Sequence, residues 1–307
     1  MNIVFHKQLL MVILIAAMAL CVIAGAWGVV LFDSETASDS LATTPISVIP
    51  TETTEGSEVD VTETTGADTT ETTTNGSSAS QSTGKYIVLT FDDGPSLYYT
   101  PAVLDLLEKY NAKATFFVNG YQLYPSKAES LKRAIALGCE IGNHTESHAN
   151  LTKLTQSEIY EEIASTNEKI KNLCGYEATL LRPPGGNTNL AVMEAMYDSG
   201  LRMYTIMWNN DSLDWSFNAD YVNGEISLEE AVQKTYDMIM GYPLQGAIVL
   251  MHDIKSVCPE VLDVLLRRLT EEGYTFLTVS EIFDFESMGE DAYFSKFYAE
   301  GNYVTLK

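Results

Sequence analysis

The stretch IVLTFDDGP, residues 87–95, indicates how the folded part of this chain is built. Its first five residues form an apolar run of the length that is typical of a buried strand. Two adjacent carboxylates, Asp92 and Asp93, follow directly, and Gly94-Pro95 then turns the chain. A strand that ends in paired carboxylates is well placed to present them to a site, although the same residues also suit a simple turn.

Strand and helix patterns alternate after this stretch. We expect strands at 87–91, 114–118, 140–143, 179–181, 201–207, 247–251 and 275–279, and helices at 101–110, 127–137, 156–173, 190–199, 227–240 and 259–269. This alternation predicts an α/β fold with a parallel sheet, and about seven units over roughly 220 residues favour one distorted (β/α) barrel. In such a barrel the functional residues lie at the carboxyl ends of the strands.

Four further polar groups each follow a predicted strand. They are HTESH at 144–148, RPPGG at 182–186, WNNDSLDW at 208–215 and LMHD at 250–253. Each group alone also has an explanation without a function. In the order given, these are surface histidines, a rigid turn, core tryptophans and a core histidine. Together with residues 92–95, all of them fall where a barrel gathers side chains on one face.

The histidines of the HTESH group are candidate metal ligands. The chain contains four histidines, and one of them, His6, precedes a long apolar segment. His144 and His148 are four residues apart, so they can meet on one metal ion if their segment is helical. Asp93 can complete the set, and two histidines with one aspartate leave positions open for water, as in catalytic sites.

The N-terminal region predicts a membrane anchor. Residues 9–32 carry no charge, and a helix of this length spans about 36 Å, enough for a hydrocarbon core of about 30 Å. Because Lys7 precedes the segment and Asp33 follows it, the positive-inside rule places residues 1–8 in the cytoplasm and the domain outside the cell. The alternative is secretion after cleavage of a signal peptide at the small residues 24–26.

The regions on either side of the expected domain, residues 85–284, have distinct compositions. Residues 33–84 are rich in Thr, Ser and Glu and poor in large apolar side chains, which predicts a disordered linker. The C-terminal tail, residues 285–307, contains several aromatic residues. We expect the tail either to pack on the barrel as a final helix or to form part of a substrate groove.

Charge and cysteine content exclude some classes of partner and site. The net charge is −24, and from residue 85 onward 32 acidic residues face 17 basic ones. Such a surface repels phosphate backbones, so we expect no nucleic-acid partner. Cys139, Cys174 and Cys258 show no CxxC spacing, which disfavours a structural zinc site. We expect free thiols, with one disulfide as the alternative.

The five polar groups, in this order, resemble the motifs of polysaccharide deacetylases, the NodB-homology group of carbohydrate esterase family 4. The resemblance covers residues 85 to about 283. One position departs from a frequent form of the family, because Gly185 stands where an aromatic residue is often found. This departure puts in doubt only the contribution of a side chain at that position to substrate contact.

The resemblance implies a metal site and a general base. A divalent ion, Zn²⁺ with Co²⁺ as the alternative, would be bound by Asp93, His144 and His148. Asp92 would be the general base that deprotonates the metal-bound water. Arg182 would hold the carboxylate of Asp92 in place.

The resemblance also implies the remaining catalytic groups. The backbone N–H of Gly185, with the metal, would support the oxyanion. His252 would be the general acid that protonates the departing amine, oriented and kept cationic by Asp214. Leu250 and Trp215 would form the walls of the acetyl pocket.

The activity that follows from these roles is hydrolysis of N-acetyl groups on cell-wall polysaccharide, with release of acetate. We favour N-acetylglucosamine or N-acetylmuramic acid of peptidoglycan, because an anchor and a linker would hold the domain within reach of a surrounding wall. The alternatives are a chitooligosaccharide deacetylase and an acetylxylan O-deacetylase with the same site. A non-catalytic wall-binding module is disfavoured, since a binder has no need of an acid and a base.

Overall fold

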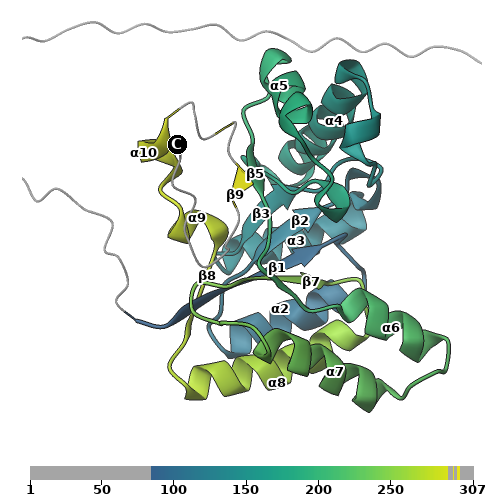
Figure 1. The fold of residues 1–307 in the computed structure, drawn as a ribbon, viewed down its shortest axis with the longest axis vertical. Coiled ribbons are helices and arrows are strands. Elements are labelled where there is room, and N and C mark those ends of the chain that lie inside the picture. The colour runs from purple at the N-terminus through teal and green to yellow at the C-terminus, as the bar shows by residue number, and fades with distance from the viewer. Residues whose placement is uncertain (1–83, 290–292, 294–295, 298–307) are drawn as a thin grey trace, which may run out of the picture. The chain divides into compact units, whose positions relative to one another are not determined.

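The computed structural model describes residues 84–289, residue 293 and residues 296–297 (Figure 1). Nine strands in this part form one sheet, in the order β6-β7-β1-β2-β3-β4-β5-β9, with β8 paired to β1. The strands are β1 (Tyr86–Asp92), β2 (Thr115–Val118), β3 (Glu140–Asn143), β4 (Leu180–Leu181), β5 (Tyr204–Ile206), β6 (Asn210–Asp211), β7 (Ile248–His252), β8 (Thr275–Leu277) and β9 (Lys296–Phe297). Their pairings are parallel, which confirms the predicted α/β class and its curled, barrel-like sheet.

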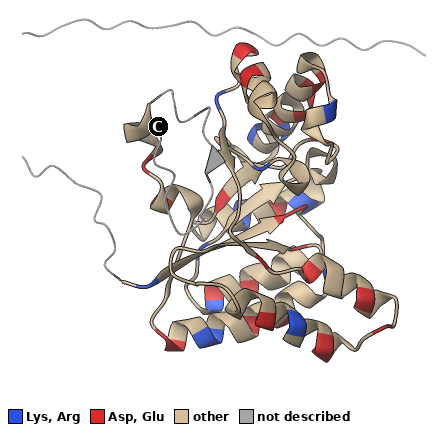
Figure 2. Ribbon diagram, in the orientation of Figure 1, with Lys and Arg blue, Asp and Glu red and all other residues tan. Residues whose placement is uncertain are grey.

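Helices form an outer layer that follows the order of the strands. They are α2 (Tyr99–Lys109), α3 (Pro125–Ala136), α4 (Gln156–Cys174), α5 (Leu190–Asp198), α6 (Asp214–Val222), α7 (Leu228–Met240), α8 (Val257–Glu271), α9 (Val279–Ile282) and α10 (Phe285–Met288), with short 3₁₀ turns η2 (Gly120–Gln122), η3 (Leu151–Lys153) and η4 (Pro184–Gly186). Packing runs from α6 through α7, α8, α2, α3 and α4 to α5, so neighbouring helices cover neighbouring strands. Figure 2 shows that acidic residues are spread over these helices, among fewer Lys and Arg residues.

The alternation of side chains along β1 divides the apolar core into two layers. Ile87, Leu89 and Phe91 belong to the cluster that packs against the helices. Val88 belongs to a second cluster on the opposite face of the sheet. Because side chains alternate with a period of two, Thr90 and Asp92 share the inner face with Val88. The polar end of β1 is therefore directed into the interior of the barrel.

The apolar pattern of α8 explains why this helix forms and which face it buries. Its buried residues recur at intervals of three and four, as an amphipathic helix requires: Val257, Cys258, Val261, Leu262, Leu265, Leu266 and Leu269. All of these except Val257 join the cluster that also contains Leu89 and Phe91 of β1. The packing of α8 therefore supports the two central strands, β1 and β7.

Several predicted boundaries are wrong, and the reasons are local. The strand expected at 275–279 ends at Leu277, because Thr278 and Glu281 form a capping box that starts α9. The strand expected at 201–207 is confined to Tyr204–Ile206. The group at 208–215 contains the strand β6 and the first residues of α6, neither of which we expected.

The described part of the C-terminal tail packs on the barrel, which is one of the two alternatives we expected, but through a short helix and a strand rather than through a helix alone. The four-residue helix α10 is followed by β9, which pairs in parallel with β5. Tyr293 stacks on Tyr204 of β5, with ring centroids 4.8 Å apart. The tail therefore adds a strand to the edge of the sheet. The substrate-groove alternative stays a prediction.

The predictions for residues 1–83, including the anchor at 9–32 and most of the linker, lie outside the described residues. Within the described part, no helix combines the length and the apolar character needed to cross a membrane.

Among the described residues, the three cysteines are free thiols, as we expected: Cys139, Cys174 and Cys258. Cys139 and Cys258 are buried.

Truncation of the core at α8 is expected to destabilise the domain. Leu265 is fully buried, so Leu265→Ala should lower the free energy of unfolding by about 2 to 5 kcal/mol through lost burial and the cavity left behind. Leu190, at the start of α5, is 60% exposed. Leu190→Ala should therefore change the stability by no more than about 0.5 kcal/mol. Urea denaturation of both variants tests this, and equal losses would contradict the assignment of α8 to the core.

Candidate active site

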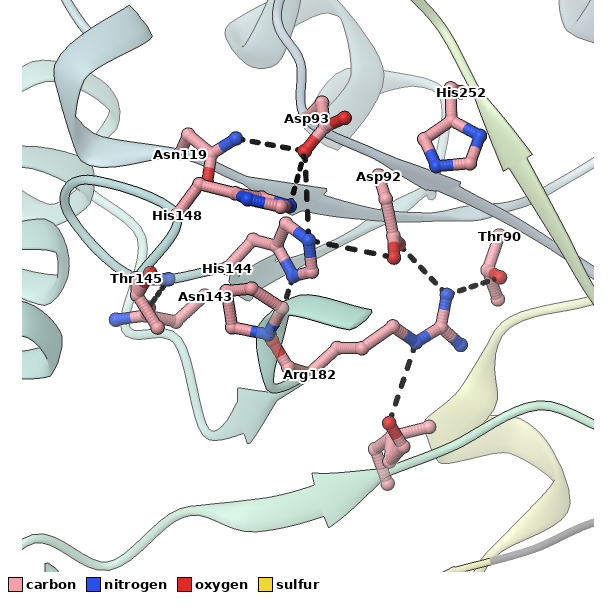
Figure 3. A network of polar contacts seen from close by, with 12 residues as sticks. Thr90, Asp92, Asp93, Asn119, Asn143, His144, Thr145, His148, Arg182 and His252 are labelled. Atoms are coloured by element: carbon pink, nitrogen blue, oxygen red, sulfur yellow. Dashed lines mark hydrogen bonds and ion pairs between the residues drawn. The ribbon is translucent and has the colours of Figure 1, made fainter. Parts of the chain in front are cut away.

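The carboxyl end of β1 brings the first two candidate residues into the barrel. Asp92 is buried and is paired in register with His252 of β7. Asp93 follows with φ 72°, in the left-handed region that residues other than glycine rarely adopt. This turn of the backbone directs the two adjacent carboxylates to different partners (Figure 3).

Arg182 holds the carboxylate of Asp92. Arg182 is fully buried, and its Nη1 donates to Asp92 Oδ1 at 2.8 Å and to the hydroxyl of Thr90 at 2.7 Å. Its Nη2 donates to the carbonyl of Met207 at 3.2 Å, and the guanidinium lies 4.2 Å from the ring centroid of Phe117. A buried charge is tolerated when it is paired and hydrogen-bonded in this way. One oxygen of Asp92 is thereby fixed, and Oδ2 faces the histidines.

His144 is held as a neutral imidazole, the form that a candidate metal ligand requires. It is buried, and its Nδ1 lies 2.7 Å from the carbonyl oxygen of Arg182. A carbonyl only accepts, so Nδ1 carries the proton and Nε2 keeps a free lone pair. Burial lowers the pKa of His144, although Asp92 and Asp93 act in the opposite direction. A neutral imidazole is the form that binds metals.

Three candidate ligand atoms converge beside this histidine. Asp93 Oδ1 lies 3.6 Å from His144 Nε2 and 3.4 Å from His148 Nε2. The three ligand atoms all lie within 4.8 Å of one another. Ligands about 2.0 to 2.1 Å from a tetrahedral ion are separated by about 3.4 Å. The residues that are present therefore fit a metal ion, as the sequence predicted.

The environment of Asp93 favours its ionised form. Burial alone would raise its pKa, but His144, His252 and His148 together lower it below the ordinary value. Asn119 contributes in the same direction by donating from Nδ2 to Asp93 Oδ1 at 3.0 Å. The carboxylate of this candidate ligand is thus kept charged and oriented by its protein neighbours.

The segment from His144 to His148 is not helical, although a helical turn was the condition under which the spacing let the two histidines meet. Thr145 and His148 have φ values of 68° and 60°, so the two histidines meet through a loop with left-handed residues. Asn143 Oδ1 accepts from the backbone N–H of Thr145 at 2.7 Å and holds the first of these turns. A spacing of four residues fitted a helix, but the tight turns of this loop produce the same convergence.

Contacts from η2 and α4 hold this histidine loop in place. The backbone N–H groups of Gly120 and Tyr121 donate to the carbonyls of Thr145 and Glu146, both at 2.9 Å. Lys169 of α4 forms an ion pair with the Glu146 carboxylate and donates to the carbonyl of Gly120 at 3.1 Å. The loop is therefore fixed by groups outside the metal site.

His252 and Asp214 form a separate pair beside Asp92. His252 Nδ1 lies 2.7 Å from Asp214 Oδ1, and the His252 backbone N–H donates to Asp214 Oδ2 at 2.8 Å. Burial would lower the pKa of His252, but Asp214 outweighs it and raises that pKa to about 9. His252 is therefore cationic at neutral pH and can act as an acid through Nε2. In Figure 3 it lies across Asp92 and Asp93 from the histidine pair.

A strained turn places Asp214 under His252. Asp211 Oδ1 accepts from the backbone N–H of Leu213 at 2.9 Å, and Leu213 has φ 52°. Asp214 is fully buried and begins α6. From this first position of the helix its carboxylate reaches Nδ1 of His252.

The remaining predicted residues lie around these two pairs. Gly185 lies in η4, exposed and with φ 58°, three residues after Arg182. Trp215 is 49% exposed at the start of α6, and Leu250 is buried on β7. The roles predicted for Gly185, Trp215 and Leu250 in oxyanion and acetyl binding stay predictions.

Three residues that support the site were not foreseen from the sequence. They are Thr90, which accepts from Arg182, Asn119, which orients Asp93, and Asn143, which shapes the histidine loop. All three are fully buried polar residues within or directly after predicted strands. A polar residue that interrupts a buried strand is a signal that could have identified them.

Comparisons with known proteins identify the family of this chain. The sequence model of the family described as polysaccharide deacetylase matches residues 79–204. Peptidoglycan-N-acetylglucosamine deacetylase PgdA of Listeria monocytogenes is 37% identical over 214 residues, which are 70% of this chain and only 42% of that protein. The chain therefore spans less than half the length of this relative.

Two further relatives are covered more fully. A peptidoglycan-N-acetylglucosamine deacetylase of Bacillus cereus is 33% identical over 64% of this chain and 88% of that protein. The solved structure of a family 4 acetyl xylan esterase from Clostridium thermocellum, in complex with a cobalt ion, superposes with a TM-score of 0.60 at 29% identity. This match covers 72% of this chain and all of the esterase chain. The chain therefore belongs to the polysaccharide deacetylase family, the NodB-homology group of carbohydrate esterase family 4.

Proposed function

We propose that this chain is a metal-dependent hydrolase that removes N-acetyl groups from peptidoglycan and releases acetate. The observation that carries the proposal is the arrangement around Asp92. A set of metal ligands lies on one side of this carboxylate, and the cationic His252 lies in register on the neighbouring strand. Hydrolysis of an amide needs a base for water and an acid for the departing amine, and both groups are present here.

Asp93, His144 and His148 would hold the ion, with Zn²⁺ favoured and Co²⁺ as the alternative. When bound, such an ion lowers the pKa of water and polarises a carbonyl group. The likeness to an esterase solved with cobalt supports a divalent ion at these residues.

Asp92 accepts the proton of the attacking water. Arg182 occupies its Oδ1, while Oδ2 lies 3.7 Å from His144 Nε2 and faces the ligand set. The hydrogen bond from Arg182 keeps the carboxylate from rotating, so one oxygen stays directed at the water. The hydroxyl of the water becomes part of acetate.

His252 donates its proton to the amine nitrogen as the bond from carbon to nitrogen breaks. Its Nδ1 is occupied by Asp214, so Nε2 is the atom that delivers the proton. The amine leaves as a neutral group and the acetyl group leaves as acetate. Gly185, Leu250 and Trp215 are proposed to stabilise the oxyanion and to enclose the acetyl group.

Peptidoglycan is the favoured substrate because two relatives carry that substrate in their names. The acetyl xylan esterase supports acetylxylan as the alternative, with an ester in place of the amide. Chitooligosaccharides and the N-acetylmuramic acid of peptidoglycan remain further candidates.

We also propose that residues 9–32 anchor the chain in the cell membrane with the domain outside, or that the chain is secreted after cleavage of a signal peptide.

Acetate release from purified polymers tests the proposed reaction. The full-length chain is expected to release acetate from peptidoglycan faster than from chitin oligomers or acetylxylan. A chelator should abolish this release, and added Zn²⁺ or Co²⁺ should restore it. A preference for acetylxylan would identify an O-deacetylase, and no release from any polymer would contradict the proposal.

Substitution of the proposed base should impair turnover without loss of the metal. In Asp92→Asn we expect kcat to fall by a factor on the order of 10² to 10⁴, because the amide cannot take a proton from water. Metal content, measured on the same sample, should be unchanged. Asp105→Asn is a matched control, since Asp105 also pairs with an arginine but is exposed on α2. Full activity of Asp92→Asn would disprove the assignment.

The pH profile should report the pairing of His252 with Asp214. Because the pKa of His252 is raised to about 9, the group keeps its acidic proton below that pH and loses it above. Asp214→Asn removes the opposite charge, so the alkaline limb of kcat/KM should move to lower pH by about 1 to 3 units. Asp220→Asn, on the same helix, should leave the limb in place. An unshifted limb in Asp214→Asn would show that another group is the acid.

A further inference from the structure

Asp253, the residue after His252, has no part in the proposed reaction although it lies beside the reacting groups. It is fully buried. Its Oδ2 accepts a hydrogen bond from the hydroxyl of Thr100, and within the described part of the chain its Oδ1 has no hydrogen-bond partner. A buried carboxylate with so few partners costs stability rather than adding to it. A role for Asp253 therefore has to lie in what it does to its neighbours.

Its first neighbour is Gly94, the residue that follows the metal ligand Asp93. A β-carbon at Gly94 would lie 2.8 Å from Cγ of Asp253 and closer still to both carboxylate oxygens. The carboxylate therefore packs directly against the backbone of Gly94. On the other side the carbonyl of Gly94 accepts from the backbone N–H of Asn119 at 3.1 Å. The Gly94 backbone is thus held between two strand-end residues.

Its second neighbour, Thr100, ties down the other end of the same loop. Thr100 is fully buried in the first turn of α2, and its hydroxyl oxygen accepts from the backbone N–H of Ser96 at 2.7 Å. The same hydroxyl donates to Asp253. One carboxylate therefore anchors the loop 94–96 at both ends, directly at Gly94 and through Thr100 at Ser96.

This anchoring acts next to a strained residue. Asp93 has φ 72°, and a residue other than glycine in this region costs on the order of 1 kcal/mol, so it needs support from its surroundings. Asn119 holds the Asp93 side chain, but that contact does not fix the backbone that follows. The loop 94–96 does fix it, because it continues directly from Asp93.

We propose that Asp253 is a positioning residue, which keeps Asp93 in its metal-binding conformation by holding the loop 94–96 against the end of β7. Asp253 directly follows His252, the proposed acid at the end of β7. It therefore links the end of β7 to the end of β1, which carries the proposed metal ligand Asp93. The inference rests on the proposed function only for its effect on turnover. Its effect on metal binding stands on the geometry alone.

Zinc affinity and turnover of the full-length chain test this proposal. Asp253→Ala is expected to raise the dissociation constant for Zn²⁺, measured by titration calorimetry, by about 10- to 100-fold. Thr100→Val, which keeps the shape but removes the hydroxyl, should weaken binding in the same direction. Asp253→Asn keeps an acceptor for Thr100 and the packing against Gly94, so it should bind Zn²⁺ nearly as the unaltered chain does.

Controls separate positioning from folding and from charge. Thr235→Val, in α7, removes a hydroxyl that is equally buried and donates to the carbonyl of Ala231 in its own helix. It should leave zinc affinity unchanged. Unaltered zinc affinity in a folded Asp253→Ala variant would overturn the proposal. An equally large loss of zinc affinity in Asp253→Asn would also overturn it, because it would indicate an effect of charge. If Asp253→Ala does not fold, unaltered affinity in Thr100→Val overturns it.

The proposed function can fail independently of this inference. Zinc titration needs no substrate, so weakened binding in Asp253→Ala supports positioning even if the unaltered chain releases no acetate. If the reaction is as proposed, kcat at saturating zinc should also fall in Asp253→Ala and recover in Asp253→Asn.

Discussion

The buried ion pair between Arg182 and Asp92 is the interaction on which the inside of this barrel depends. Removing two charges from water costs several kcal/mol for each, so neither group is tolerated there without the other. Arg182 also donates to the carbonyl of Ile206 on β5 and to the hydroxyl of Thr90 on β1. The strands β1, β4 and β5 must therefore be assembled around it. Loss of one partner would leave an unpaired buried charge and cost about 3 to 5 kcal/mol. The same ion pair thus stabilises the interior of the barrel and orients the carboxylate of Asp92.

Backbone strain is concentrated around this pair. Five residues other than glycine have positive φ values in the described part of the chain, and four of them, Asp93, Thr145, His148 and Leu213, lie in the site. Each costs on the order of 1 kcal/mol and persists only where neighbouring groups hold it. Asn143 and Asp211 supply such contacts, and the backbone N–H of Asn119 holds the residue that follows Asp93. Rigid support by the sheet therefore lets the loops present ligands in conformations that an isolated loop would avoid.

The site uses histidine in two opposite ways. Burial lowers the pKa of His144, whose Nδ1 donates to a carbonyl, so this ring is neutral and offers a lone pair. The carboxylate of Asp214 raises the pKa of His252 to about 9, so that ring carries a proton to give. Both rings are buried, so the difference lies in the charges that oppose burial. The directly bonded Asp214 outweighs burial at His252, whereas burial prevails over Asp92 and Asp93 at His144.

Sequence by itself determined the α/β class, the run of strands and helices, and the grouping of Asp92, Asp93, His144, His148, Arg182 and His252 at strand ends. Alternation of apolar runs and the scarcity of histidine carry that information, because both are local properties of the chain. Tertiary structure alone decided that the two histidines meet through a left-handed loop, that Asn119 and Thr90 support the charged groups, and that the tail adds a strand beside β5. It also decided the contact of Asp253 with Gly94. These contacts join residues far apart in the chain, and no local pattern records them, since they depend on how parallel strands set their ends side by side.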